Sequence, residues 1–86
     1  MSRQRSMEAI LASEFVSIGE LVRLTNSRYS TLKFYTEEGM LPFDQAGENL
    51  MRRFHREKSI ARIEEIKSLK RQGFTIPEIK KFLKKT

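Results

Sequence analysis

Hydrophobic residues recur at three- and four-residue spacing through most of this sequence, and the spacing breaks once, in the middle. Residues three and four apart share one face of an α-helix, so these repeats predict amphipathic helices. The long predicted helices cover 18–24, 28–38, 56–72 and 76–84. A shorter apolar repeat predicts a short helix over 7–13, packed either on the domain or on a partner.

Capping signals support the predicted helix ends. Ser17-Ile18-Gly19-Glu20 and Thr75-Ile76-Pro77-Glu78 both fit the capping box, in which a hydroxyl and a carboxylate each bond a free backbone amide. Gly39 and Gly73 stand where a helix C-terminus favours glycine. The patterns also predict which side chains are buried, and these include Leu32 and Phe34 in the second long helix and Ile76, Ile79, Phe82 and Leu83 in the last.

The turn between the first two long helices is short. Thr25-Asn26-Ser27 interrupts the apolar repeat, since asparagine tolerates a left-handed backbone and Ser27 is suited to cap the following helix. Two helices joined by a turn of three or four residues have the outline of a helix-turn-helix.

The break in helical spacing falls over residues 40–54. Two short runs, 40–43 and 50–54, are separated by residues rich in turn formers, and they predict a β-hairpin over 41–54 with a loop of roughly six residues. The expected fold is mainly α, a winged helix-turn-helix with four helices and a two-stranded β-hairpin wing after the second. Residues 15–86 would form this domain, and residues 1–14 a flexible or short helical N-terminal extension.

The composition excludes several classes of function. Eighty-six residues suffice for one small domain. There is no cysteine, His55 is the only histidine, and the four glycines match no phosphate-binding fingerprint, so we expect no enzyme, no catalytic residues, no cofactor and no metal site. No apolar run approaches the roughly 18 residues of a membrane span, which favours a cytoplasmic protein with no membrane partner.

The net charge of +6 is unevenly distributed. Residues 1–55 carry seven basic and seven acidic side chains, whereas residues 56–86 carry ten and four. A basic balance favours a polyanionic partner such as nucleic acid, although a solvated basic face gives the same pattern.

Five motifs occur in order along the segment from Val16 to Leu83. They are Ile18-Gly19-Glu20-Leu21, Ser30-Thr31-Leu32-Lys33-Phe34-Tyr35, Glu38-Gly39-Met40-Leu41-Pro42, Arg52-Arg53-Phe54, and Gly73-Phe74-Thr75-Ile76 with Glu78-Ile79. With these motifs the segment resembles the winged-helix DNA-binding domain of MerR-type transcriptional regulators. The resemblance implies sequence-specific binding of double-stranded DNA by a cytoplasmic, nucleoid-associated protein, with the second helix in the major groove and the wing on the backbone. Four residues depart from the family pattern, namely Asn26 and Ser27 in the turn, Phe34 for a tyrosine, and His55 for a serine or threonine cap.

The start of the second helix supplies the candidate base contacts. The positions that would enter the groove are Arg28, Tyr29, Ser30 and Lys33. Arg28 would make a bidentate contact to guanine, and Lys33 would reach a base or a phosphate. The structural alternatives are a solvent-exposed Arg28 and a Tyr29 that staples the helix end to its neighbour.

Candidate phosphate contacts come from three other places. Tyr35 resembles the phosphate-binding tyrosine of the family, with a core aromatic as the alternative. Arg52 and Arg53 are adjacent on a strand, so they point to opposite faces, and the sequence does not choose between them. Ser17 would leave helix amides free for a phosphate or would simply cap its helix.

Two other functions stay open at this stage: an excisionase-like or segregation-related architectural DNA-binding protein, and a winged-helix protein-interaction module without DNA binding. MerR-type regulators continue into a dimerisation helix and an effector-binding region, whereas this sequence stops at Thr86. Three explanations for this difference stay open: a truncated chain, a free-standing small regulator and an architectural protein. The sequence leaves open the cognate DNA, activation against repression, and whether the chain binds as a homodimer or as a side-by-side oligomer.

Overall fold

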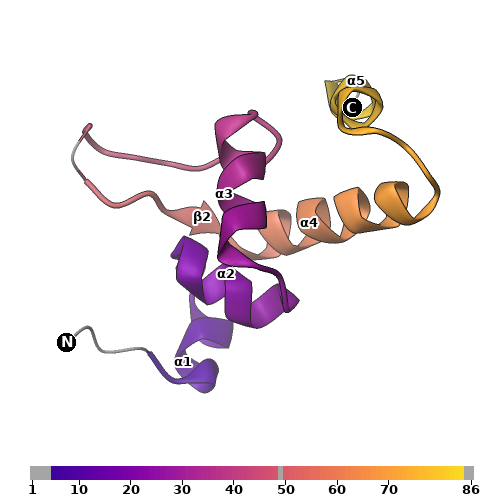
Figure 1. Ribbon diagram of the computed structural model, residues 1–86. Helices are drawn as coiled ribbons and strands as arrows, with labels where there is room; N and C mark the ends of the chain where they lie inside the picture. The colour runs from indigo at the N-terminus through magenta and orange to yellow at the C-terminus, as the bar shows by residue number, and fades with distance from the viewer. Residues whose placement is uncertain (1–4, 49, 85–86) are drawn as a thin grey trace.

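The computed structural model describes residues 5–48 and 50–84 (Figure 1). Residues 1–4 of the predicted extension, Asn49 of the wing loop and residues 85–86 lie outside the described part. The fold is mainly helical, as predicted, with a wing between its third and fourth helices. Its elements are α1 (Met7–Ala12), β1 (Phe15–Val16), α2 (Ile18–Thr25), α3 (Tyr29–Glu37), β2 (Phe54–His55), α4 (Arg56–Arg71) and α5 (Ile76–Lys84).

The turn between α2 and α3 has the predicted left-handed residue. Asn26 adopts φ 51° and ψ 44°. Ser27, however, does not cap α3, whose N-cap residue is Arg28 with no side-chain cap bond. The Ser27 hydroxyl instead lies 2.7 Å from the hydroxyl of Thr25, which in turn donates to Leu21 O at 2.7 Å. The predicted cap is therefore wrong, because the Thr25 hydroxyl holds the serine side chain within the turn.

The last two helices begin and end close to the predicted residues. The Nδ1 atom of His55 accepts from the Lys58 amide at 3.4 Å, so the histidine takes the place of the usual hydroxyl cap of α4. Gly73 follows α4 with φ 96°. The capping box of α5 is confirmed, with the Thr75 amide donating to Glu78 Oε1 at 2.8 Å and the Glu78 amide to Thr75 Oγ1 at 3.4 Å.

The core lies where α2, α3 and α4 meet, and α1 contributes Ile10 to it. Two predicted core aromatics are outside it, since Phe34 is 43% and Phe82 is 47% exposed. Helical geometry explains both errors: Phe34 lies opposite Leu32 on α3, and Phe82 falls at the edge of the α5 face that buries Leu83. The buried hydrophobic residues are Ile10, Val16, Leu21, Leu32, Tyr35, Met40, Leu41, Phe54, Ile63, Ile66, Leu69, Ile79 and Leu83.

The wing extends from the end of α3 as two segments that run out and return (Figure 1). One β-bridge joins them, with backbone hydrogen bonds of 2.8 Å in both directions between Asp44 and Arg53. The returning segment enters β2, which pairs antiparallel with β1 so that Val16 lies opposite Phe54. The predicted strand 40–43 is therefore not a strand, because burying Phe54 draws the ladder toward β1 instead.

Among the described residues, no helix combines the length and the apolar character that crossing a bilayer requires.

Candidate nucleic-acid interface

A groove separates the helix-turn-helix from the wing. One part of it, of about 400 Å³, is lined from both sides. An adjoining hollow of about 780 Å³ extends it past β1 toward the N-terminal segment. We call the two parts together the helix–wing groove. Its lining includes Ser17, Gly19, Tyr29, Lys33, Met51 and Arg52 in the first part, with Arg5, Glu20, Arg23 and Arg53 in the adjoining hollow.

The start of α3 presents the predicted candidate side chains to solvent. Arg28, Tyr29, Ser30 and Lys33 are all exposed, Tyr29 by 54%. Across the described residues, none of these four side chains has a hydrogen bond or an ion pair. Leu32 on α3 is fully buried, and Ser30 lies on the opposite side of the helix from it. These four residues therefore form a polar row that is available to a partner.

The two wing arginines rest on different aromatic rings. The guanidinium carbon of Arg52 lies 4.6 Å from the centroid of Phe43, and that of Arg53 lies 5.2 Å from the centroid of Phe15. Arg52 also comes within 3.9 Å of the Glu37 carboxylate. Such stacking restricts a long side chain while leaving its charge close to solvent. Both arginines line the helix–wing groove.

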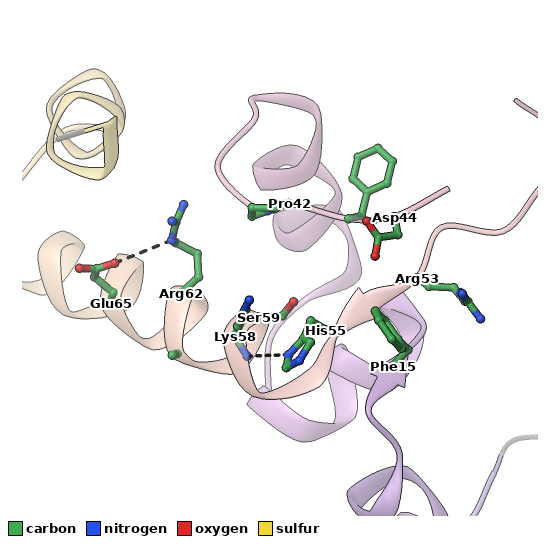
Figure 2. A pocket seen from close by; sticks show the side chains of 11 residues that line it. Phe15, Pro42, Asp44, Arg53, His55, Lys58, Ser59, Arg62 and Glu65 are labelled. Atoms are coloured by element: carbon green, nitrogen blue, oxygen red, sulfur yellow. Dashed lines mark hydrogen bonds and ion pairs between the residues drawn. The ribbon is translucent and has the colours of Figure 1, made fainter. Parts of the chain in front are cut away.

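Arg53 borders a second cavity as well. Figure 2 shows this cavity, of about 680 Å³, between the base of the wing and the first turns of α4. His55 lines it, with its ring edge-on to Phe15 at a centroid distance of 5.7 Å and its Nδ1 atom engaged as the α4 cap. Within residues 5–48 and 50–84, no three histidine, cysteine, aspartate or glutamate side chains gather as metal ligands.

Ser17 performs the capping role that the sequence offered as one of its two alternatives. Its hydroxyl accepts from the Glu20 amide at 3.2 Å, and its own amide donates to Glu20 Oε1 at 2.9 Å. The amino-terminal turn of α2 therefore has a carboxylate of its own beside its backbone amides.

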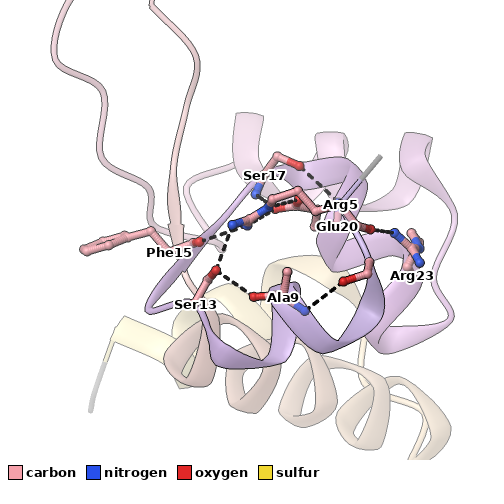
Figure 3. Close-up of polar contacts among 8 residues, drawn as sticks. Arg5, Ala9, Ser13, Phe15, Ser17, Glu20 and Arg23 are labelled. Atoms are coloured by element: carbon pink, nitrogen blue, oxygen red, sulfur yellow. Dashed lines mark hydrogen bonds and ion pairs between the residues drawn. The ribbon is translucent and has the colours of Figure 1, made fainter. Parts of the chain in front are cut away.

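The carboxylate of Glu20 is held from the other side by Arg5, ahead of α1 (Figure 3). Arg5 Nε and Nη2 lie 2.7 Å from the two carboxylate oxygens, and Nη1 donates to Ser13 Oγ at 2.7 Å. Hydrogen bonds lower the pKa of Glu20 below its usual value, and the bond from Arg5 has a larger effect than the bond from the Ser17 amide. Arg23 completes the cluster by donating to Arg5 O at 2.8 Å. The sequence analysis missed Arg5 and Arg23, because no local pattern marks a contact between residues 15 apart.

Tyr35 occupies a different environment from the one predicted. Its side chain is only 3% exposed and belongs to the core, with the ring of Phe34 at a centroid distance of 6.1 Å. Helical spacing places Tyr35 on the buried face with Leu32 and Thr36. The structure therefore favours the core alternative for Tyr35 over a phosphate contact.

Comparison with protein-family models matches residues 16–86 to the family described as MerR HTH family regulatory protein. Comparisons with curated proteins and with solved structures give no significant match. The family match covers the helix-turn-helix, the wing and both C-terminal helices, and it confirms the resemblance carried by the sequence motifs. That family consists of DNA-binding transcription regulators rather than enzymes. The chain therefore belongs to the MerR HTH family of regulatory proteins.

Proposed function

We propose that this domain binds double-stranded DNA sequence-specifically as part of a transcriptional regulator. The observation that carries the proposal is the polar row at the start of α3, exposed and without intramolecular polar partners, beside two wing arginines across the helix–wing groove. A helix fits the major groove of B-DNA, which is about 12 Å wide.

In this arrangement α3 reads the bases. Arg28 stands at its first turn, where a bidentate contact to guanine is worth about 1–3 kcal/mol of discrimination. Lys33 lies on the same side of the domain, lining the groove with Tyr29. It reaches either a base edge or the adjacent phosphate.

The wing supplies contacts to the backbone. Arg52 and Arg53 are positioned by their aromatic rings, so less conformational entropy is lost when each meets a phosphate. Contacts to phosphates provide affinity that does not depend on sequence. With roughly four to six phosphates engaged, the slope of log K against log salt would be about −4 to −5.

The expected assembly on DNA is two copies on related half-sites. A single module of this kind buries about 600–1,000 Å² of protein surface, which is small for a specific genomic site. A homodimer and a side-by-side oligomer both meet this need, and footprint length distinguishes them. A compact palindromic footprint fits a regulator, whereas cooperative spreading over repeated sites would indicate the architectural function instead.

The test is selection of binding sites from random duplexes, followed by fluorescence-anisotropy titrations at two salt concentrations. Arg28→Ala should relax the sequence preference, and Arg52→Ala should weaken binding to all duplexes by a similar factor. Arg71→Ala is the matched control, because Arg71 is exposed at the far end of α4 and loses the same charge. Parent-like binding by both Arg28→Ala and Arg52→Ala would refute the assigned face. No salt-sensitive association by the parent would favour a protein-interaction module.

A further inference from the structure

Ser59, near the start of α4, differs from the other buried polar side chains of the domain. Thr25 and Thr36 are also buried, and each donates its hydroxyl to the carbonyl one turn earlier in its helix, at 2.7 and 2.9 Å. Ser59 is only 3% exposed, yet within residues 5–48 and 50–84 its hydroxyl has no hydrogen-bond partner. A buried hydroxyl without a partner costs stability, so its presence indicates another role.

The hydroxyl of Ser59 opens onto the cavity between the base of the wing and α4 (Figure 2). No side-chain oxygen or nitrogen in the described part of the chain is both enclosed and unpaired, so the Ser59 oxygen reaches a surface. Ser59 lines this cavity, whose volume of about 680 Å³ falls within the range of about 300–1,000 Å³ that is usual for small-molecule sites. The unpaired hydroxyl therefore indicates a ligand with a polar group.

The charges that line the cavity favour a ligand with one negative charge. Lys58 and Arg53 have no ion pair among the described residues, whereas Arg62 lies 3.8 Å from Glu65. Asp44 is the other lining carboxylate, so three basic against two acidic side chains give the lining a formal net charge of +1. The cavity also lies at the amino-terminal turns of α4, where the helix dipole favours an anion. A monoanion balances this lining, whereas Asp44 would repel a dianion.

The donors beside Ser59 suit a carboxylate. His55 Nδ1 accepts from the Lys58 amide, so the neutral imidazole carries its proton on Nε2. This Nε2 atom and the Lys58 ammonium are without hydrogen-bond partners in the described part. Figure 2 shows Ser59, His55 and Lys58 side by side at the cavity. A carboxylate accepts several hydrogen bonds and donates none, so it matches a cluster of a hydroxyl, an imidazole and an ammonium.

The other part of the lining is apolar and flat. The half-buried ring of Phe15 has the His55 ring edge-on to it, and the Arg53 guanidinium carbon lies 5.2 Å from its centroid. Pro42 adds an exposed apolar side chain from the start of the wing. Aromatic rings and guanidinium planes both stack on flat ring systems. An aromatic ligand can therefore lie against Phe15 while its charged group meets the donors of α4.

We propose that this cavity binds a small aromatic carboxylate, whose ring packs against Phe15 and whose carboxylate accepts hydrogen bonds from Ser59 and Lys58. The site lies on α4 and the base of the wing rather than on the polar row of α3. The inference therefore goes beyond DNA binding and is tested without DNA.

The first test titrates the isotope-labelled domain with naphthoate and follows the backbone amide signals by NMR. The largest shifts should fall on residues that line the cavity, with a Kd of about 1 mM or below, as expected for a probe of this size. The neutral amide of naphthoate, which lacks the charge, and acetate, which lacks the ring, should each bind at least several-fold more weakly. Absence of shifts at the cavity, or equal binding of the neutral amide or of acetate, overturns the inference.

The second test removes the unpaired hydroxyl. Ser59→Ala should weaken naphthoate binding about tenfold, because a hydrogen bond to a charged group is lost. Ser68→Ala is the matched control, since Ser68 lies on α4 outside the cavity and its hydroxyl accepts from Gln72 at 3.2 Å. Because the Ser59 hydroxyl has no internal partner, Ser59→Ala should also unfold at or above the Tm of the parent. Parent-like naphthoate binding by Ser59→Ala overturns the inference, and so does a lower Tm, which would assign the hydroxyl to a bond within the domain.

Discussion

Ser17 allows the capping role and the phosphate-binding role to be separated in one experiment. Ser17→Ala removes the acceptor of the 3.2 Å bond from the Glu20 amide and leaves the reciprocal 2.9 Å bond in place. Loss of an N-cap hydroxyl costs about 1 kcal/mol of unfolding free energy, within a range of about 0.5–2 kcal/mol. For a domain of this size, 1 kcal/mol corresponds to a fall in Tm of about 4–8 °C.

The assay is thermal unfolding followed by circular dichroism, with DNA binding measured well below the transition. Ser17→Thr is the control, because threonine also caps helices and should keep Tm within a few degrees of the parent. Once folded, Ser17→Ala should bind DNA like the parent. An unchanged Tm for Ser17→Ala would refute the assigned cap. A large loss of DNA affinity in Ser17→Ala but not in Ser17→Thr would show that the hydroxyl contacts a phosphate.

Two further predictions concern stability. Asn26→Ala should lose about 1 kcal/mol of unfolding free energy relative to Asn26→Gly in urea denaturation, because φ at this position is 51° and a Cβ is disfavoured there; equal stability of the two variants would contradict this. Because the folded pKa of Glu20 is lowered, its contribution to stability is present above its unfolded pKa of about 4.5 and is lost as pH falls through the lower folded value. Urea denaturation between pH 3 and pH 7 should therefore show a smaller acid destabilisation in Glu20→Gln than in the parent, and curves of the same shape would contradict the role of Arg5.

The wrong predictions for individual side chains in and before α3 have a common source. Phe34 and Tyr35 exchange their expected environments, although strict helical spacing from Leu32 would have placed Tyr35 inside and Phe34 outside. Ser27 was expected to cap α3 from its residue type alone, and the Thr25 hydroxyl engages it instead. In both cases a preference of one residue type yielded to the geometry of its neighbours.

The predicted strand over 40–43 failed for a different reason. Phe54 pairs through its strand with Val16, and both residues are buried. A hairpin pattern describes only the chain on either side of a turn, so it gave no information about this competing strand 38 positions upstream. The single bridge between Asp44 and Arg53 is what remains of the predicted ladder.

The sequence by itself determined the helices, the capping boxes, the left-handed turn residue and the family, because these depend on hydrogen bonds and spacings within a few residues. Only the tertiary structure decided the pairing of β1 with β2, the contact of Arg5 with Glu20, and the formation of the helix–wing groove. These features join segments far apart in the chain. Their geometry follows from how the helices pack, which no local pattern encodes.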